Sequence, residues 1–523
     1  LSFQGDIAKD KSGYGKGAPS NLIQYVTWSG NVYDTEKDLQ LKDFNSSLER
    51  STMVGMFGRV AYNYKQKYFL SVTLRRDASS KFGENTRWGT FPSYAIAYTF
   101  TEEPYMDWAR DFLDFGKVRL SYGKSGKQFE YPYFAFGVLI VNNVPFHGNQ
   151  TITPYWPDGL INPKLSWEET KQFDAGLDLE FFGNRLSFEL DYYYRYTDKL
   201  LAQVTLPGDY NAYISQWQNA YAISNQGIEL QIKADFVRSE KLHWDFSFNI
   251  ARNWNRFEKS NNGMDFTNLA SKHNLNIIGK PLNGIYVYND QGYYNSQDEV
   301  PLYYVNGRRK YLSSLGNQIY TPGDRRIQDV DGNGQVATMV PLLEDRVYGG
   351  SPLPLAFGGI ATTLKWKGID VNLLFSYKLG RHVLNAGRGA SVGTILRANT
   401  AEMMVPILAD LDKVSFWQKP GDNTDFPINE LENGKNNFAT NLKSNVEKIN
   451  YLKLKSISIG YTLPVFPKQS KHYARVFMSV ENVFTITNSS SPDPESIDIV
   501  TGVDSNNNYP LATRYTLGLT LNL

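Results

Sequence analysis

Residues 162–201 read NPKLSWEETKQFDAGLDLEFFGNRLSFELDYYYRYTDKLL, and every other residue from 186 to 196 is aliphatic or aromatic. The apolar series is Phe188, Leu190, Tyr192, Tyr194 and Tyr196. Mostly polar residues lie between its members, and Gly183-Asn184 separates this run from the first half of the stretch. Period-two alternation is typical of a β-strand with one apolar and one polar face. The stretch therefore predicts two antiparallel strands joined by a tight turn.

The same alternation recurs along the chain in runs of about ten residues, the length of a tilted strand that crosses a lipid bilayer. We expect about 13 such strands. Their spans are 55–64, 68–76, 92–101, 116–124, 170–181, 185–196, 226–236, 242–254, 355–366, 368–378, 450–463, 473–484 and 513–523. This pattern predicts an all-β protein.

The connections between these strands alternate between short and long. The short ones are 65–67, 183–184, 237–241 and 367–368. The long ones are 125–169, 197–225, 255–354, 379–449 and 485–512. A barrel of the outer membrane has short periplasmic turns and long extracellular loops. The sequence therefore predicts a transmembrane antiparallel β-barrel, in which 102–115 is a longer, helical periplasmic connection.

The polar faces of the expected strands carry charged residues, among them Asp178, Asp191, Glu229 and Lys233. Burying such groups without partners in a dry core would be costly. The alternation therefore predicts that these faces line a polar interior, while the apolar faces contact outer-membrane lipid.

Composition excludes several classes of protein. Lys and Arg total 54 and Asp and Glu total 53, so the charge balance gives no reason to expect a nucleic-acid partner. The chain contains no run of about 18 apolar residues, which is the signal that predicts a transmembrane helix. Aromatic residues make up 14% of the chain, as suits the aromatic girdles of membrane barrels. Cysteine is absent, which removes disulfides and thiolate metal sites.

A set of motifs in a fixed order resembles the SusC/RagA-like TonB-dependent transporters of the outer membrane. They are FGRVAYNYKQKYFLSVTLRRDASSKFG (57–83), FGKVRLSYGKSGK (115–127), residues 162–201, NQGIEL (225–230), GDRRIQDVDGNG (323–334), YLKLKSISIGYTLP (451–464), ENVFTIT (481–487) and DPE (493–495). The resemblance extends from about residue 50 to the C-terminus, and the number and order of the motifs make it specific.

The resemblance implies a barrel of about 22 strands that is filled by an N-terminal plug. TonB, with ExbB and ExbD, pulls that plug through a TonB box, and a SusD-like surface lipoprotein covers the extracellular face. The nutrients imported are oligosaccharides or peptides. We expect residues 1–54 to be an extracellular loop segment and residues 55–523 to be the C-terminal part of the barrel. The plug and the N-terminal strands are absent from this sequence, so we expect an N-terminal half to close the barrel.

One loop sequence predicts a cation site. Asp329, Asp331 and Asn333 stand at positions 1, 3 and 5 of an EF-hand-like loop, and the carbonyl of Gln335 stands at position 7. Val340 at position 12 cannot supply the usual carboxylate, but Asp345 follows after a longer loop. We expect a structural Ca²⁺ or Mg²⁺ that stiffens an extracellular loop, and the alternative is a plain Asp/Gly turn.

Three loop aromatics, Trp156, Trp217 and Tyr221, are candidates for stacking on a sugar substrate. The alternative, which we favour, is that they pack against other loops or a lid protein.

Three functions agree with the chain to different degrees. The first is the wall of a nutrient importer. The second is a SusC-like barrel that serves as a non-transporting scaffold in a larger assembly. The third is an all-β surface enzyme, which leaves the short and long connections unexplained. The chain has no zinc-spaced histidines, G-x-S-x-G or P-loop, and we expect the carboxylate pairs Glu102-Glu103 and Glu168-Glu169 to be solvated. We therefore expect no enzymatic activity.

Overall fold

The fold is described from a computed structural model of the chain. The described residues are 2–15, 32–34, 39–130, 135, 139–141, 155–157, 160–206, 215–239, 241–260, 266–267, 273–305, 307–314, 317–336, 345–387, 415–428, 440–463, 473–505 and 509–522. The chain divides into two compact units. Unit 1 is Leu1–Asp178, Asp191–Gln226 and Phe257–Met264, and unit 2 is Leu179–Leu190, Gly227–Arg256 and Asp265–Leu523.

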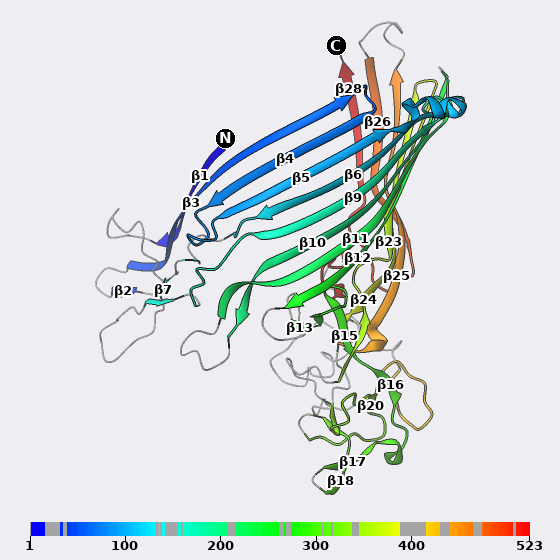
Figure 1. Cartoon of the computed structure of the whole chain (residues 1–523). Helices are drawn as coiled ribbons and strands as arrows, with labels where there is room; N and C mark the ends of the chain where they lie inside the picture. Colours follow the sequence, from blue (N-terminus) through cyan, green and yellow to red (C-terminus); the bar gives the residue numbers. More distant parts are fainter. Residues whose placement is uncertain are drawn as a thin grey trace. The chain divides into compact units, whose positions relative to one another are not determined.

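One large β-sheet dominates the part of the chain that the structure describes. It has 16 strands, and most of them follow one another in the order β1-β3-β4-β5-β6-β9-β10-β11-β12-β23-β24-β25-β26-β28. Strand β2 pairs with β3 and β27 pairs with β24. Strands β1 and β28 stand at the two ends of this order. Figure 1 shows the long strands and their labels.

Most strands of the first half are long, and eight of them, from β3 onward, overlap the predicted spans. They are β1 Ser2–Gly15, β2 Val32–Asp34, β3 Leu39–Tyr64, β4 Tyr68–Ser79, β5 Trp88–Thr99, β6 Leu113–Lys127, β9 Glu168–Phe181, β10 Leu186–Thr205, β11 Ser215–Arg238 and β12 Leu242–Ser260. The short pair β7 Leu139–Val141 and β8 Tyr155–Pro157 forms a separate hairpin. Strands β9 to β12 contribute residues to both units.

The remaining strands of the large sheet belong to unit 2. They are β23 Ala356–Trp366, β24 Ile369–Asn385, β25 Val446–Leu463, β26 Tyr473–Thr487, β27 Val503–Asp504 and β28 Arg514–Asn522. Each predicted span overlaps one strand of the sheet. The structure adds β1, which pairs antiparallel with β3 inside the segment 1–54 that was expected to be a loop. That segment is therefore largely strand, and its extracellular position stays a prediction.

Two neighbouring rows of residues show why unit 2 has two chemically different faces. One row crosses six strands and is entirely apolar: Trp244, Leu364, Val371, Ile459, Met478 and Leu517. The adjacent row is entirely polar: Asp245, Thr363, Asn372, Ser458, Ser479 and Thr516. Because successive side chains of a strand point to opposite faces, the two rows lie on opposite sides of the sheet. We call these sides the apolar face and the polar face.

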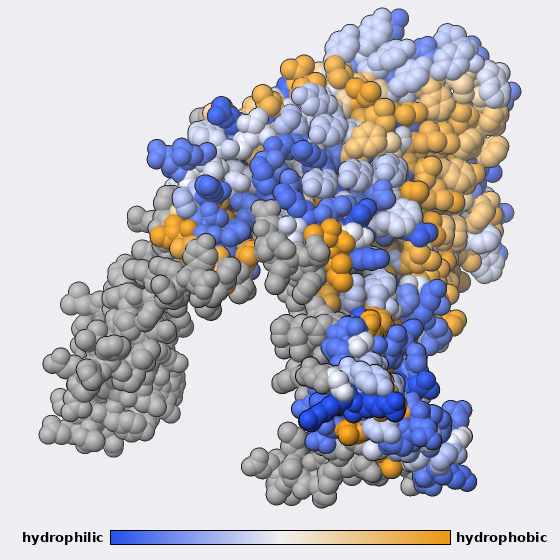
Figure 2. All heavy atoms as spheres, turned by 60° about the horizontal axis from the view of Figure 1, so that its bottom comes forward, coloured by the Kyte–Doolittle hydropathy of each residue, from blue (hydrophilic) through white to orange (hydrophobic). Residues whose placement is uncertain are grey.

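Unit 1 repeats this arrangement. Tyr62, Leu70, Ile96 and Leu120 are paired across β3 to β6, and each is exposed. A row of exposed large apolar side chains is unfavourable in water, which implies that another apolar medium covers it. In the space-filling view, apolar side chains gather in a band on the wall of strands (Figure 2).

The short helical elements lie at the connections. Segments η1 Phe100–Glu102 and η2 Pro104–Ala109 join β5 to β6 (Figure 1), where a longer helical connection was predicted, and both are 3₁₀ rather than α. Two more 3₁₀ turns are η3 Gln297–Glu299 and η5 Lys443–Asn445. None of the described helical segments has the length and apolar character needed to cross a membrane.

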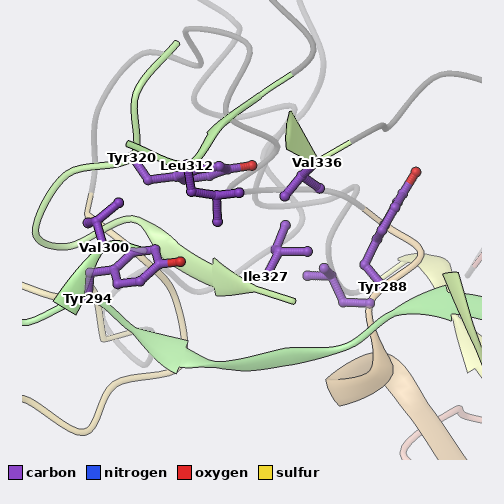
Figure 3. Close-up of a cluster of buried hydrophobic side chains, with 8 residues drawn as sticks. Tyr288, Tyr294, Val300, Leu312, Tyr320, Ile327 and Val336 are labelled. Carbon is purple, nitrogen blue, oxygen red and sulfur yellow. The ribbon is translucent and has the colours of Figure 1, made fainter. Parts of the chain in front are cut away.

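The long connection predicted over 255–354 is a folded module, which the sequence did not indicate. Its strands are β13 Phe266–Thr267, β14 Asn274–Ile277, β15 Gly284–Tyr288, β16 Asp290–Tyr293, β17 Leu302–Val305, β18 Arg308–Tyr311, β19 Ser313–Ser314, β20 Arg325–Ile327, β21 Gln335–Val336 and β22 Arg346–Gly350. Buried residues from this connection, with Leu442, form a separate hydrophobic core (Figure 3): Tyr288, Tyr294, Val300, Leu312, Tyr320, Ile327 and Val336.

Candidate functional site

The polar face of unit 1 carries an ion-pair network centred on Arg119 of β6. Its guanidinium donates two hydrogen bonds to the carboxylate of Asp178 on β9, at 2.8 and 2.7 Å. It also donates to Asp191 on β10 at 3.0 Å. A side chain at Gly176 would lie 2.7 Å from this guanidinium, so glycine leaves the space that Arg119 occupies. Asp178 and Asp191 were predicted on the polar face, and the structure confirms this and identifies their partner.

A second network lies on the same strands. The carboxylate of Glu169 binds Lys124 Nζ at 2.7 Å and Lys199 Nζ at 2.8 Å. The sequence predicted Glu168-Glu169 as a solvated pair, but Glu169 is tied to two lysines instead. The two lysines hold the Glu169 carboxylate in a fixed position on the polar face. The contacts of this carboxylate are those of a paired, structural charge.

Between these charges and β3, the polar face is hollowed. The hollow has a volume of 460 Å³, and small residues line much of it, among them Ala61, Ala95, Ala97 and Gly176. Arg119 and Asp174 contribute its polar rim. Small and apolar side chains thus form most of this hollow, with charged groups at its rim.

The loop at 329–334 brings together three of the predicted cation ligands. Ligand oxygens of Asp329, Asp331 and Asp345 lie within 4.8 Å of one another, and Asp345 is completely buried. The amide N–H groups of Gly332 and Gly334 donate to Asp329, at 2.8 and 2.9 Å. The loop therefore has the compact turn that the motif predicts.

The other two predicted ligands are less directly placed. The side-chain oxygen of Asn333 accepts from the backbone N–H of Gln335 at 2.7 Å. The side chain of Gln335 donates to Asn317 at 2.9 Å. Nearby, burial and the neighbouring Asp329 raise the pKa of Tyr303 to about 12. Phenol and carboxylate are thus close together beside the loop.

The structure describes the side chains of two of the three candidate substrate aromatics, and both pack against other aromatic residues. Trp217 stacks edge-on against Phe129, with ring centroids 4.9 Å apart, and packs on the core cluster of unit 1. Tyr221 is buried against Phe257. Trp156 belongs to β8, and its side chain lies outside the described residues. Contact with substrate by these residues stays a prediction.

Sequence reasoning missed an ionic latch in unit 2. Lys453 of β25 binds Asp493 at 3.1 Å and Glu495 at 3.0 Å, and Lys455 binds Glu495 at 2.8 Å. Arg381 of β24 is buried beside it and donates to backbone carbonyls of Pro352 and of the segment 497–498. These contacts therefore hold the connection after β26 against strands β24 and β25.

The signal for this latch was present in the sequence as two separate motifs, YLKLK and DPE. Nothing in their spacing indicates that they meet, because a lysine on a polar face and an acidic turn are each common alone. The pairing appears only when the connection folds back on its own strands.

Comparison with known proteins agrees with this architecture. Residues 1–385 match the family described as TonB dependent receptor-like, beta-barrel, and the chain belongs to that family. The all-β barrel fold predicted from the alternation is thereby confirmed. The family is one of outer-membrane receptors and transporters rather than enzymes.

Individual relatives extend the comparison. The chain is 30% identical to TonB-dependent receptor P3 of Formosa agariphila, covering 97% of this chain and 49% of that protein. It is 27% identical to TonB-dependent receptor SusC of Bacteroides thetaiotaomicron, covering 92% and 45%. The solved RagAB peptide transporter matches with a TM-score of 0.73 at 22% identity, over 99% of this chain and 52% of that one. The chain thus spans about half the length of the curated relatives that it matches, and its resemblance to SusC is confirmed.

Proposed function

We propose that this chain forms most of the wall of a barrel that imports a nutrient across the outer membrane. The apolar face contacts lipid, and the polar face lines the passage. Strands from an N-terminal half, with a plug, complete the wall between β1 and β28. TonB with ExbB and ExbD moves that plug, and a SusD-like lipoprotein covers the extracellular side. Relatives about twice as long, one of them named SusC and one the RagAB peptide transporter, support these partners.

The observation that carries the proposal is the contrast between adjacent rows. Moving one residue along each of six strands changes an all-apolar row into an all-polar one. A soluble sandwich buries its apolar side chains against a second sheet, whereas large side chains of this row, such as Leu517 at 78%, are exposed. Lipid on one side and an aqueous passage on the other account for both rows.

Uptake by cells tests the proposal. Cells that carry the complete transporter are given a labelled neutral oligosaccharide or a labelled peptide, with and without a functional TonB. TonB-dependent entry of one class supports an importer and names its substrate class. If neither class enters and the complex still assembles in the membrane, the scaffold function replaces the importer.

We further propose that Asp329, Asp331 and Asp345 hold a structural Ca²⁺ or Mg²⁺, with Asn333 and the carbonyl of Gln335 completing the ligands. Support comes from the motif and from the convergence of the three carboxylates. Terbium luminescence is a direct probe, because the Tyr303 ring beside Asp329 can sensitise a bound lanthanide.

For this cation site, we expect terbium emission that Ca²⁺ displaces, and a melting temperature that rises with Ca²⁺ by mass action. Asp331→Asn should lower both effects, whereas Asp298→Asn on the exposed turn of the same module should change neither. If Asp331→Asn and the original chain give equal emission, the loop is a plain turn.

A further inference from the structure

Unit 2 has a groove on its apolar face. It has a volume of 750 Å³ and is lined mainly by aliphatic and aromatic side chains. Phe248 of β12 and Tyr377 of β24 form its floor, with their rings parallel within 5° and their centroids 6.2 Å apart. Leu379 and Ile486 at its edge are 41% and 62% exposed. The floor is therefore a flat apolar surface that is open to the surroundings.

Gly358 makes room for the floor of this groove. Gly358 of β23 is paired with Ile250 on one side and Tyr377 on the other. A side chain there would lie 2.0 Å from the backbone carbonyl of Asn249, so none fits. The ring of Tyr377 crosses the gap, and its hydroxyl donates to that same carbonyl at 2.8 Å. Glycine at this position thus leaves room for the Tyr377 ring, which forms part of the floor.

A second hollow, of 440 Å³, lies along the same strands beyond the groove, toward the ends that carry the long connections. Along β12 the series of Phe248 and Ile250 continues with Arg252 and Trp254, and Arg252 stacks on the Trp254 ring at 4.5 Å. Both residues line this hollow, together with His382 of β24. The apolar face therefore becomes cationic and aromatic at this level.

Lys448 of β25 adds a second permanent cation at the same level. It is paired with His382, and its side chain passes 3.7 Å from where a side chain at Gly380 would begin. Gly380 donates its N–H to Asn450, which lines the apolar groove, so the groove and the cationic end adjoin. Among the described residues, neither hollow is lined by Asp or Glu.

An apolar groove that ends in cations and a tryptophan is complementary to an anionic amphiphile. Acyl chains lie on apolar side chains, tryptophan prefers the membrane–water boundary, and Arg and Lys there attract lipid phosphate. Each cation near such a surface adds to the attraction of an anionic headgroup. A neutral ligand would lack the charge attraction of Arg252 and Lys448.

We infer that this groove binds a phosphorylated acyl lipid of the outer leaflet, namely the lipid A part of lipopolysaccharide. One acyl chain lies on the Phe248–Tyr377 floor, and the phosphates lie at the level of Arg252 and Lys448. The inference rests on the proposed membrane orientation, in which the ends with long connections face the cell exterior.

The test is a titration of the complete transporter with bisphosphorylated lipid A in a mild detergent, followed by native mass spectrometry. The double variant Arg252→Glu/Lys448→Glu should weaken binding by about 30-fold or more, since two attractive charges are lost and reversed. Ile360→Trp should also weaken binding, because it fills the groove above its floor. The control Arg308→Glu/Lys310→Glu makes the same charge change on exposed residues of the loop module and should have no effect.

Further arms separate the possible sources of binding. Lipid A without phosphates should bind the original protein as weakly as lipid A binds the double variant, and millimolar inorganic phosphate should not compete. Equal binding of the two lipids, or competition by free phosphate, overturns the inference. So does efficient homodimer cross-linking through Ile486→Cys, which would show that a second copy covers the groove.

The orientation is measured separately by labelling intact cells that carry Lys310→Cys in the loop module. Labelling together with loss of lipid specificity rejects the lipid site alone. Failure of labelling when the protein is correctly inserted rejects the orientation on which the site and the proposed function both rest.

Discussion

At the scale of single residues, Arg119 shows how one side chain organises the polar face. It bridges two strands by binding Asp178 and Asp191, so its removal leaves two carboxylates facing each other. We expect Arg119→Ala to lower the free energy of unfolding by about 1 kcal/mol, since the arginine is 40% exposed and solvent screens the pair. Denaturant unfolding in detergent measures this change.

A matched control for Arg119 exists in unit 2. Lys233 and Glu189 lie 3.7 Å apart and both are about half exposed, so Lys233→Ala should cost near zero. A larger effect at Lys233 than at Arg119 would contradict the role given to the network.

Lys453 is a cation whose burial makes its ion pairs important for stability. It is 3% exposed and lies beside two carboxylates, one of which is 6% exposed. Removing one partner of a buried pair typically costs about 3 kcal/mol or more. We expect Lys453→Ala to release the connection 488–505 to proteolysis, whereas Lys455→Ala, at a position that is 33% exposed, should leave it protected. Protection that is unchanged in Lys453→Ala would rule out the latch.

At the scale of elements, each strand has two faces with different tolerance for charge. Ile459 and Ser458 are neighbours on β25 and belong to the apolar and the polar row respectively. We expect Ile459→Arg to destabilise the protein by about 2–4 kcal/mol in a membrane, and Ser458→Arg to be tolerated. Folding yield in lipid vesicles measures both. Since Ile459 is 50% exposed, a water-covered surface would accept Arg at that position, and equal yields would contradict the assignment of lipid to this face.

The latched connection also predicts a response to acid. Burial raises the pKa of Asp493, but backbone N–H groups of Glu495 and Leu511 and the ammonium of Lys453 outweigh burial and leave it below the ordinary value. The pKa of Glu495 is likewise lowered, since Lys455 and Lys453 outweigh its burial. The stabilisation is therefore fully present above the unfolded-state values of about 4 and is lost as pH falls through the lower folded-state values.

Hydrogen exchange over 488–505 measures this response. After correction for intrinsic rates, we expect equal protection at pH 7 and 5 and a loss at pH 3. Lys455→Met should move the loss to higher pH, because Glu495 then lacks the cation that lowers its pKa most. Loss of protection between pH 7 and 5 in the original protein would conflict with lowered pKa values.

At the scale of the whole molecule, strands β1 and β28 stand at the two ends of the large sheet. Strand β28 pairs with β26 on one side, and an unpaired edge in lipid costs several kcal/mol per polar group. We expect all backbone amides of β28 to be protected from exchange in the complete transporter, and alternate amides to exchange rapidly in this chain by itself. Equal protection in both would mean that β28 needs no further strand.

The strands that could be predicted from the sequence are those with a clear period of two. Runs such as 188–196 identify strands because lipid on one face and the lumen on the other impose a period of two on the sequence. The strand β1 lacks that signal, since SFQGDIAKDKSGYG is mostly polar. The folded module in the connection 255–354 was not predicted, because its core is made of single residues from many short segments. The convergence of Asp329, Asp331 and Asp345 was predictable because a local motif supplies most of it.

The core of the loop module has a consequence for the order of synthesis and assembly. Leu442 completes that core, and the backbone N–H of Tyr288 binds the carbonyl of Asn441. Both β23 and β24 lie between these partners in the chain. The core of the module therefore cannot be completed until the part of the chain that carries these two strands and Leu442 is present. A chain shortened just after β24 would keep both strands but lack Leu442, and its buried tyrosines would lose a packing partner.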